Sequence, residues 1–190
     1  MSLLIVGLLL FLGAHSVQIF AAPWREAFIA KRGPGPWKGL YSLMAGLGFV
    51  LIIVGYANAR AAPPLWGRPP GALHLAMGLV ATAFILLTAA YWPRNHIKTA
   101  VRDPMVLGVG VWALGHLMVK ASLPALLLFG GFLAWAILDF LSLRRRPSAN
   151  TAGPAPTAMN TIGTVVVGLV IFFIVFRWGH IALIGVSPAG

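Results

Sequence analysis

The sequence has no cysteine and only three acidic residues among its 190. Without cysteine the chain can form no disulfide, thiolate metal site, iron–sulfur cluster or cysteine nucleophile. Glu26, Asp103 and Asp139 are too few and too far from mid-span to form a paired-carboxylate acid–base site, a proton relay or a Ser-His-Asp triad. Neither G-x-x-x-x-G-K-[ST] nor G-x-G-x-x-G occurs, so the sequence gives no support for nucleotide binding.

Charge of either sign is scarce as well. Charged residues make up 9% of the chain, against roughly a quarter in an ordinary soluble domain. Hydrophobic residues make up 59%, and the mean hydropathy is +0.91. A net charge of +11 is typical of nucleic-acid binders, but here the cations lie in short loops between long apolar runs, which is the pattern of membrane proteins. These features exclude a soluble domain, a disordered chain and a nucleic-acid-binding protein, and they make the lipid bilayer the expected partner.

The apolar runs predict an all-α bundle of six transmembrane helices in a single domain, residues 1–190. A helix needs about 20 apolar residues to cross the bilayer core. The spans are expected at about 3–22, 40–59, 72–92, 104–119, 124–143 and 161–184. No basic residue precedes the first span and no A-x-A cleavage site follows it, so we interpret it as a retained span and not a signal peptide. Asp103 and Pro104 are expected to begin the fourth span as N-cap and first-turn proline, and residues 147–157 predict a flexible loop.

The basic residues predict the orientation of this bundle. Ten of the 14 lysines and arginines fall in the first, third and fifth loops: Arg25, Lys31, Arg32, Lys38, Arg94, Lys98, Arg102, Arg144, Arg145 and Arg146. The positive-inside rule therefore places these loops in the cytoplasm and both termini outside. Tryptophans near the span ends agree with an aromatic belt: Trp24, Trp37, Trp66 and Trp92.

Histidine is the polar residue that remains within the apolar runs. His15, His74, His116 and His180 lie on four different spans. A lone membrane histidine commonly packs or hydrogen-bonds, but imidazole is also a frequent ligand of haem iron and other transition metals. At 1.5 Å per residue, three of the four fall within roughly 8 Å of the outer end of their spans, whereas His15 lies about 18 Å deep. Depth alone therefore groups His74, His116 and His180 at one outer site for haem or a metal.

A stripe of residues on the fourth span has two interpretations. Gly108, Trp112 and His116 follow one another at intervals of four, with Gly115 alongside, so they share a helix face. The glycines leave room for a flat macrocycle on which Trp112 could stack, or they let spans four and five pack closely. The same two interpretations apply to a stripe on the first span, formed by Gly7, Phe11 and His15.

Two further features of the sixth span bear on a ligand. Arg177 precedes His180 by one turn, where it would either pair with a haem propionate or extend to the outer surface. An aromatic stretch is expected to line an apolar cavity: Phe172, Phe173 and Phe176.

Several motifs, in order, resemble those of one known family. They are GLLLFLGAHSVQIF at 7–20, WKGLYSL at 37–43, NHIK at 95–98, RDPMVLGVGVWALGHL at 102–117 and FGGFLAWAILD at 129–139. By these motifs the chain resembles the NnrU family over nearly its whole length, and that family is similar to the plant 15-cis-zeta-carotene isomerase. The resemblance implies a multi-pass haem b protein of the bacterial inner membrane, with His15 and His116 as axial ligands of the iron. His74 and His180 are the reserve ligands.

The resemblance also implies a range of functions. In the plant enzyme a cysteine three residues before the second axial histidine is an alternative ligand, and here that position is Ala113. The first expectation is redox-dependent cis–trans isomerisation of a lipophilic polyene. The alternatives are a haem protein of nitric oxide and nitrite metabolism, as in denitrification, that binds the small diatomic molecule, and a non-catalytic membrane electron carrier or accessory subunit.

Overall fold

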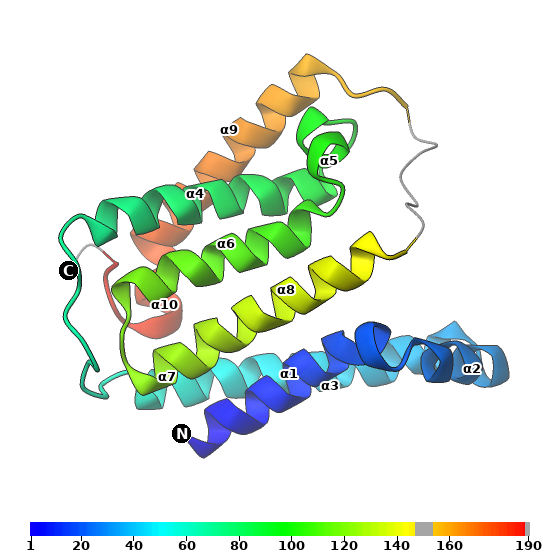
Figure 1. Ribbon diagram of the computed structural model, residues 1–190, viewed down its shortest axis with the longest axis horizontal. Coiled ribbons are helices and arrows are strands. Elements are labelled where there is room, and N and C mark those ends of the chain that lie inside the picture. Colours follow the sequence, from blue (N-terminus) through cyan, green and yellow to red (C-terminus); the bar gives the residue numbers. More distant parts are fainter. Residues whose placement is uncertain (147–153, 189–190) are drawn as a thin grey trace.

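The computed structural model describes residues 1–146 and 154–188, and these residues form an all-helical bundle (Figure 1). Of the loop predicted at 147–157, residues 147–153 lie outside the described part of the chain. The helices are α1 (Ser2–Phe20), α2 (Ala22–Arg32), α3 (Pro34–Ala59), α4 (Ala72–Tyr91), α5 (His96–Val101), α6 (Pro104–Val119), α7 (Leu123–Ala125), α8 (Gly131–Arg144), α9 (Ala158–Ile174) and α10 (His180–Ile184), with the π-helical segments η1 (Leu126–Gly130) and η2 (Val175–Gly179).

Five helical stretches in the described residues are long and apolar enough to cross a membrane. They are α1, α3, α4, the continuous stretch Leu123–Arg144 and the continuous stretch Ala158–Ile184. The fourth predicted span coincides with α6, which is apolar but only 16 residues long. Because a bilayer core offers no water to hydrogen-bond a bare backbone, apolar runs of this length satisfy their own main-chain groups as helices.

The sequence predicts a loop between the first two spans, but the chain forms the helix α2 there. Pro23 lies in the first turn of α2 and Pro34 in that of α3, where the missing N–H costs nothing. Gly33 separates the two helices with φ of +80°, a conformation that glycine adopts readily. As a result α3 begins six residues before the expected Leu40, because hydropathy records the apolar run and not the amphipathic turns that precede it.

Figure 1 shows the long helices side by side in an arc, in the order α3, α1, α8, α6, α4, α9. Beyond α9, the last helix of this arc, the chain turns back toward the first, because α10 contacts α3. We call the end of the bundle where α3 and α6 finish and α1 and α4 begin the His116 end; it also holds α7 and α10 and lies on the left in Figure 1. The opposite end, with α2 and the end of α8, is the Arg146 end.

Glycines bring neighbouring helices into backbone contact at three crossings. A Cβ on Gly7 of α1 would lie 2.7 Å from the main-chain nitrogen of Ile52 on α3. A Cβ on Gly168 of α9 would lie 2.8 Å from Cα of Ile85 on α4. A Cβ on Gly108 of α6 would lie 3.1 Å from Cγ of Leu87 and 3.1 Å from the carbonyl oxygen of Ala83, both on α4. The predicted room for a macrocycle at Gly108 is therefore filled by α4, and the small residues pack the fourth span against the third, not the fifth.

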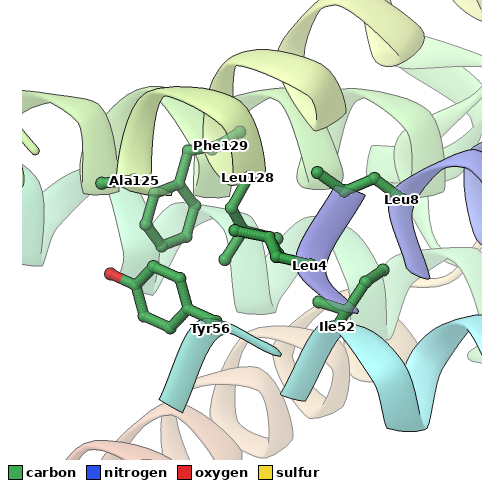
Figure 2. Close-up of a cluster of buried hydrophobic side chains, with 8 residues drawn as sticks. Leu4, Leu8, Ile52, Tyr56, Ala125, Leu128 and Phe129 are labelled. Carbon is green, nitrogen blue, oxygen red and sulfur yellow. The ribbon is translucent and has the colours of Figure 1, made fainter. Parts of the chain in front are cut away.

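The largest buried cluster ties α1 and α3 to the start of the fifth span (Figure 2). Leu4 and Ile52 belong to one cluster of buried side chains with Leu128 and Phe129 from η1, and Leu4 lies next to Leu128. The ring of Tyr56 meets Phe129 edge-on, with centroids 5.9 Å apart. This cluster fixes Phe129 in place at the His116 end.

Helix starts in the described chain use side-chain caps selectively. Asp103 takes the expected N-cap position of α6, but its side chain caps no N–H, and its Oδ2 is buried without a hydrogen-bond partner. Asn95 does cap α5, accepting from the main-chain nitrogen of Lys98 at 2.8 Å. Thr157 caps α9 in the same way.

Candidate functional site

A cavity of about 450 Å³ lies inside the arc at the His116 end. Helices α3, α4 and α6, the segments η1 and η2 and the residues around α10 all contribute to its wall. The wall is mainly apolar, and its aromatic members are Tyr56, Phe84, Trp112, Phe129, Phe172 and Phe176. Its volume falls within the roughly 300–1,000 Å³ of small-molecule and cofactor sites.

Two of the four membrane histidines line this cavity together. The rings of His116 and His180 have centroids 6.2 Å apart and planes 18° apart. His116 Nδ1 lies 2.8 Å from the carbonyl oxygen of Trp112, and His180 Nδ1 lies 3.1 Å from that of Val175. A carbonyl oxygen only accepts, so each Nδ1 carries the ring proton and, in the neutral ring, Nε2 carries the lone pair. Both imidazoles are thus held in the tautomer that binds a metal through Nε2.

Both π-helical segments of the described chain adjoin this histidine pair. Phe129 belongs to η1 and stacks on His116, with ring centroids 4.5 Å and planes 20° apart. His180 follows η2 directly, and its bond to Val175, five residues earlier, spans that segment. Such π-helical turns occur frequently at functional sites. Their position here marks the cavity as more than a packing defect.

The polar side chains of the cavity wall come from the ends of helices. Arg60 caps the C-terminus of α3 and Lys120 that of α6, and both line the cavity with Ser122 and Ser187. The guanidinium of Arg60 lies beside Gly185, where α10 ends. The cavity wall is therefore mainly apolar, and it is cationic where α3 and α6 end, at Arg60 and Lys120.

His15 lies in a different cavity from His116. Its Nδ1 is 2.7 Å from the carbonyl oxygen of Phe11, and it lines a second, more polar cavity near the Arg146 end. A chain of aromatic rings fills the space between the two histidines. His15 stacks on Phe11 at 4.2 Å between centroids, Phe11 meets Phe132 at 5.5 Å, and Phe132 meets Trp112, also at 5.5 Å. The structure thus brings His116 together with His180 and not with His15.

The other predicted site residues have mixed placements. Trp112 lines the cavity, and its ring centroid lies 5.0 Å from that of His116. His74 is exposed and does not line the cavity, although its neighbour Leu73 does. Arg177 is also exposed, with its guanidinium 5.8 Å from the ring centroid of Trp178.

Of the phenylalanines expected to line a cavity, Phe172 and Phe176 do so, whereas Phe173 packs against Trp178 and is not part of the wall. Phe129, Tyr56, Arg60 and Lys120 were not anticipated as site residues. Only the positions of Arg60 and Lys120, at span ends next to the His116 layer, offered a signal for them in the sequence.

The described residues contain no group of three or more His, Cys, Asp or Glu side chains that could hold a metal ion. A metal coordinated by the protein alone therefore has no candidate site in residues 1–146 and 154–188. A cofactor that brings most of its own ligands needs only one or two side chains, which the histidine pair provides.

Comparison with known proteins matches the chain to a family model. The family model described as NnrU protein matches residues 3–188. No curated protein and no solved structure matches the chain.

Proposed function

The chain belongs to the NnrU family, and we propose that it is a bacterial inner-membrane protein that binds haem b in the cavity at the His116 end. The observation that carries this proposal is the pair His116 and His180, whose rings lie 6.2 Å apart on one apolar cavity, each with Nδ1 on a main-chain carbonyl. In this proposal α6 also crosses the membrane, which makes six spans in total, and both termini face the outside.

The spacing and the tautomers of the histidine pair support such a cofactor. A metal–nitrogen bond is roughly 2 Å long and the ring centroid lies roughly 1 Å beyond the nitrogen, so two imidazoles on one ion have centroids roughly 6 Å apart. The observed separation agrees with that value. Arg60 and Lys120 supply cations for the two carboxylates of haem b, and the aromatic wall suits its apolar ring.

His116 is the ligand on which the structure and the family resemblance agree. For the second ligand the geometry favours His180, whereas the resemblance implies His15, and His74 is the least supported because it is exposed. We therefore propose His116 and His180 as the pair that holds the cofactor.

The chemistry we propose is redox-dependent cis–trans isomerisation of a lipophilic polyene. Haem b, when bound, would supply an iron that exchanges one electron and could take a further ligand. The carbonyl oxygens of Trp112 and Val175 keep the imidazoles oriented, and the apolar wall excludes water. Phe84, Phe172 and Phe176 offer a polyene a wholly apolar surface beside the histidines.

The experiment is absorption spectroscopy of protein purified in mild detergent from haem-sufficient cells, with four alanine variants. We expect a Soret band that shifts on reduction and the split visible bands of low-spin, bis-histidine haem. His116→Ala should lose the haem or convert it to high spin, and His180→Ala should convert it to high spin. His74→Ala is the matched control, since it removes an exposed histidine from the same end of the bundle, and it should leave the spectrum unchanged.

The contrary outcomes are distinct. A colourless preparation would refute haem binding. A high-spin spectrum in His15→Ala but not in His180→Ala would identify the ligand pair that the resemblance implies. A cis-polyene added to the reduced protein should be converted to the trans isomer; binding of nitric oxide without any polyene turnover would favour the nitric oxide function instead.

A further inference from the structure

A second cavity, of about 390 Å³, opens near the Arg146 end, well away from the His116–His180 pair. It is bounded by α1, α2, α3 and Arg146, which lies two residues beyond the end of α8. Six side chains give it its chemistry: His15, Gln18, Arg25, Trp37, Tyr41 and Arg146. The function proposed above makes no use of this cavity.

Two guanidinium groups from distant parts of the chain meet at this cavity, and no carboxylate is among its lining residues. Arg146 donates through Nη2 to the main-chain oxygen of Gln18 at 2.7 Å and to Ser142 Oγ at 2.6 Å, and both acceptors are neutral. Arg25 lies 5.6 Å from the ring centroid of Trp37. Asp139 is close enough to interact electrostatically with Arg146, but it does not line the cavity. The cavity therefore presents positive charge to any ligand that enters it.

One residue of the cavity wall carries an unused hydrogen-bond acceptor. Gln18 Oε1 is buried, and within the described residues it has no hydrogen-bond partner. A buried acceptor without a donor is costly, so such atoms in native proteins generally mark a missing ligand or water. A ligand that supplied both an anionic group for the arginines and a hydroxyl for Gln18 would satisfy the site.

The surroundings indicate that such a ligand comes from the membrane. Trp24 and Phe28 of the amphipathic helix α2 pack on Trp37, and each of their ring centroids lies 5.9 Å from that of Trp37. Such a group of aromatic rings is typical of the interfacial belt of a membrane protein. Two residues along the helix from the lining residues Gln18 and Tyr41, the apolar side chains of Phe20 on α1 and Leu43 on α3 are about 70% exposed, which suits contact with acyl chains. A volume of about 390 Å³ suits a headgroup rather than a whole lipid.

We propose that this cavity binds the phosphodiester headgroup of an acidic phospholipid, with Arg25 and Arg146 on the phosphate and Gln18 accepting from a headgroup hydroxyl. Arginine suits this role because its planar fork of donors matches two phosphate oxygens at once. The preferred headgroup is then one that carries both a phosphate and a free hydroxyl, such as phosphoglycerol.

The test is native mass spectrometry of the detergent-purified full chain titrated with dioctanoyl phosphatidylglycerol, phosphatidic acid and phosphatidylcholine. We expect phosphatidylglycerol to bind most tightly and phosphatidylcholine at least tenfold more weakly. Arg146→Gln should weaken phosphatidylglycerol binding on the order of tenfold. Arg145→Gln is the matched control, because it removes the same charge from the neighbouring, exposed position outside the cavity, and it should have little effect.

A second variant keeps the test decisive if Arg146→Gln folds poorly. Gln18→Met removes the unpartnered acceptor at similar volume and leaves both arginines in place. It should reduce the preference for phosphatidylglycerol over phosphatidic acid while leaving phosphatidic acid binding unchanged.

Four outcomes would overturn the proposal. Equal loss in Arg146→Gln and Arg145→Gln would show a diffuse electrostatic surface in place of a site. Equal binding of phosphatidylglycerol and phosphatidylcholine would remove the role of charge. Full competition by glycerol phosphate or inorganic phosphate, at concentrations comparable to the lipid, would identify a soluble phosphate ligand. Loss of lipid binding on haem loading, together with haem loss in His15→Ala, would assign the cavity to the carboxylates of the cofactor.

Discussion

His15, His116 and His180 each hold Nδ1 against a main-chain carbonyl oxygen four or five residues earlier in the chain. This bond satisfies a polar atom that the membrane would otherwise penalise, and it leaves Nε2 as the atom that faces other groups. Local helix geometry explains the bond at all three positions. What distinguishes the residues is the neighbour that each ring meets, which is Phe129 and His180 for His116 but Phe11 and Tyr41 for His15.

At the same scale, the placement of the arginines changes which cation should matter to a cofactor. Arg60 lines the cavity, whereas Arg177 points to the exposed ring of Trp178. We expect Arg60→Gln to raise the rate of haem loss about fivefold, or ~1 kcal/mol, because an exposed cation contributes modestly to an ion pair. The measurement is haem transfer to excess apomyoglobin, followed at the Soret band.

Arg177→Gln serves as the control for that measurement, since it removes the same charge from the same end of the bundle. Its rate should match that of the unmodified protein. Faster loss in Arg177→Gln than in Arg60→Gln would contradict the assignment and restore the role expected from the sequence.

Among the helices, close packing depends on a few glycines rather than on the many that the chain contains. Gly7 and Gly48 bring α1 and α3 into backbone contact, with any added Cβ at 2.7 Å from the partner main chain. Gly13, on the same helix as Gly7, has no neighbour within 4 Å of such a Cβ. Small residues permit the close approach on which helix association in membranes relies.

We therefore expect Gly7→Leu to destabilise the protein by roughly 1–3 kcal/mol or more, because the side chain must push α3 away. Gly13→Leu, the matched control, should leave stability within about 0.5 kcal/mol of the parent. Unfolding in mixed micelles with increasing SDS, followed by circular dichroism, measures both. Equal effects of the two substitutions would mean that α1 and α3 do not cross at Gly7.

The π-helical segments are the element-level feature that hydropathy does not reveal. An apolar run has the same hydropathy whether its main-chain hydrogen bonds span four residues, as in an α-helix, or five, as in a π-helix. In η1 and η2 the extra residue per turn changes which side chains face the cavity, and it brings Phe129 onto His116 and Val175 within reach of His180.

For the molecule as a whole, Met1 and α10 lie at the same end of the bundle in Figure 1, as an even number of crossings requires. The excess of basic residues at the Arg146 end makes that end cytoplasmic in our proposal. We expect alkaline phosphatase to be active when fused after Gly190 and inactive when fused after Ser148, since the enzyme folds only outside the cytoplasm. A green fluorescent protein fused at the same sites is the control and should give the opposite pattern.

Activity after Ser148 together with inactivity after Gly190 would invert the orientation. The anionic-lipid cavity would then face the outer leaflet and the His116–His180 cavity the cytoplasmic side. The packing of the helices would be unaffected, because it does not depend on which way the bundle is inserted.

Much of the fold was predictable from the sequence, and less of the candidate site. The limits of α4 and α6 follow from hydropathy and from the residues that begin and end helices. Both helices begin where the sequence predicts, at Ala72 and Pro104. The helix α2 was missed, because a short amphipathic helix leaves no long apolar run. His116 and Trp112, predicted as site residues, both line the larger cavity, and their role there stays a prediction. Which histidine lies beside His116 depended on which helices meet.

The sequence by itself determined that this is a helical membrane protein of the NnrU family, since length of apolar run, scarcity of charge and ordered motifs are local properties of the chain. The tertiary structure decided how the histidines are divided between two cavities. The depth of a residue along a helix follows from counting residues. The cavity that its side chain faces depends on how each helix is rotated and packed. That rotation is set by contacts between residues far apart in sequence, such as Gly7 with Ile52 and Phe129 with His116.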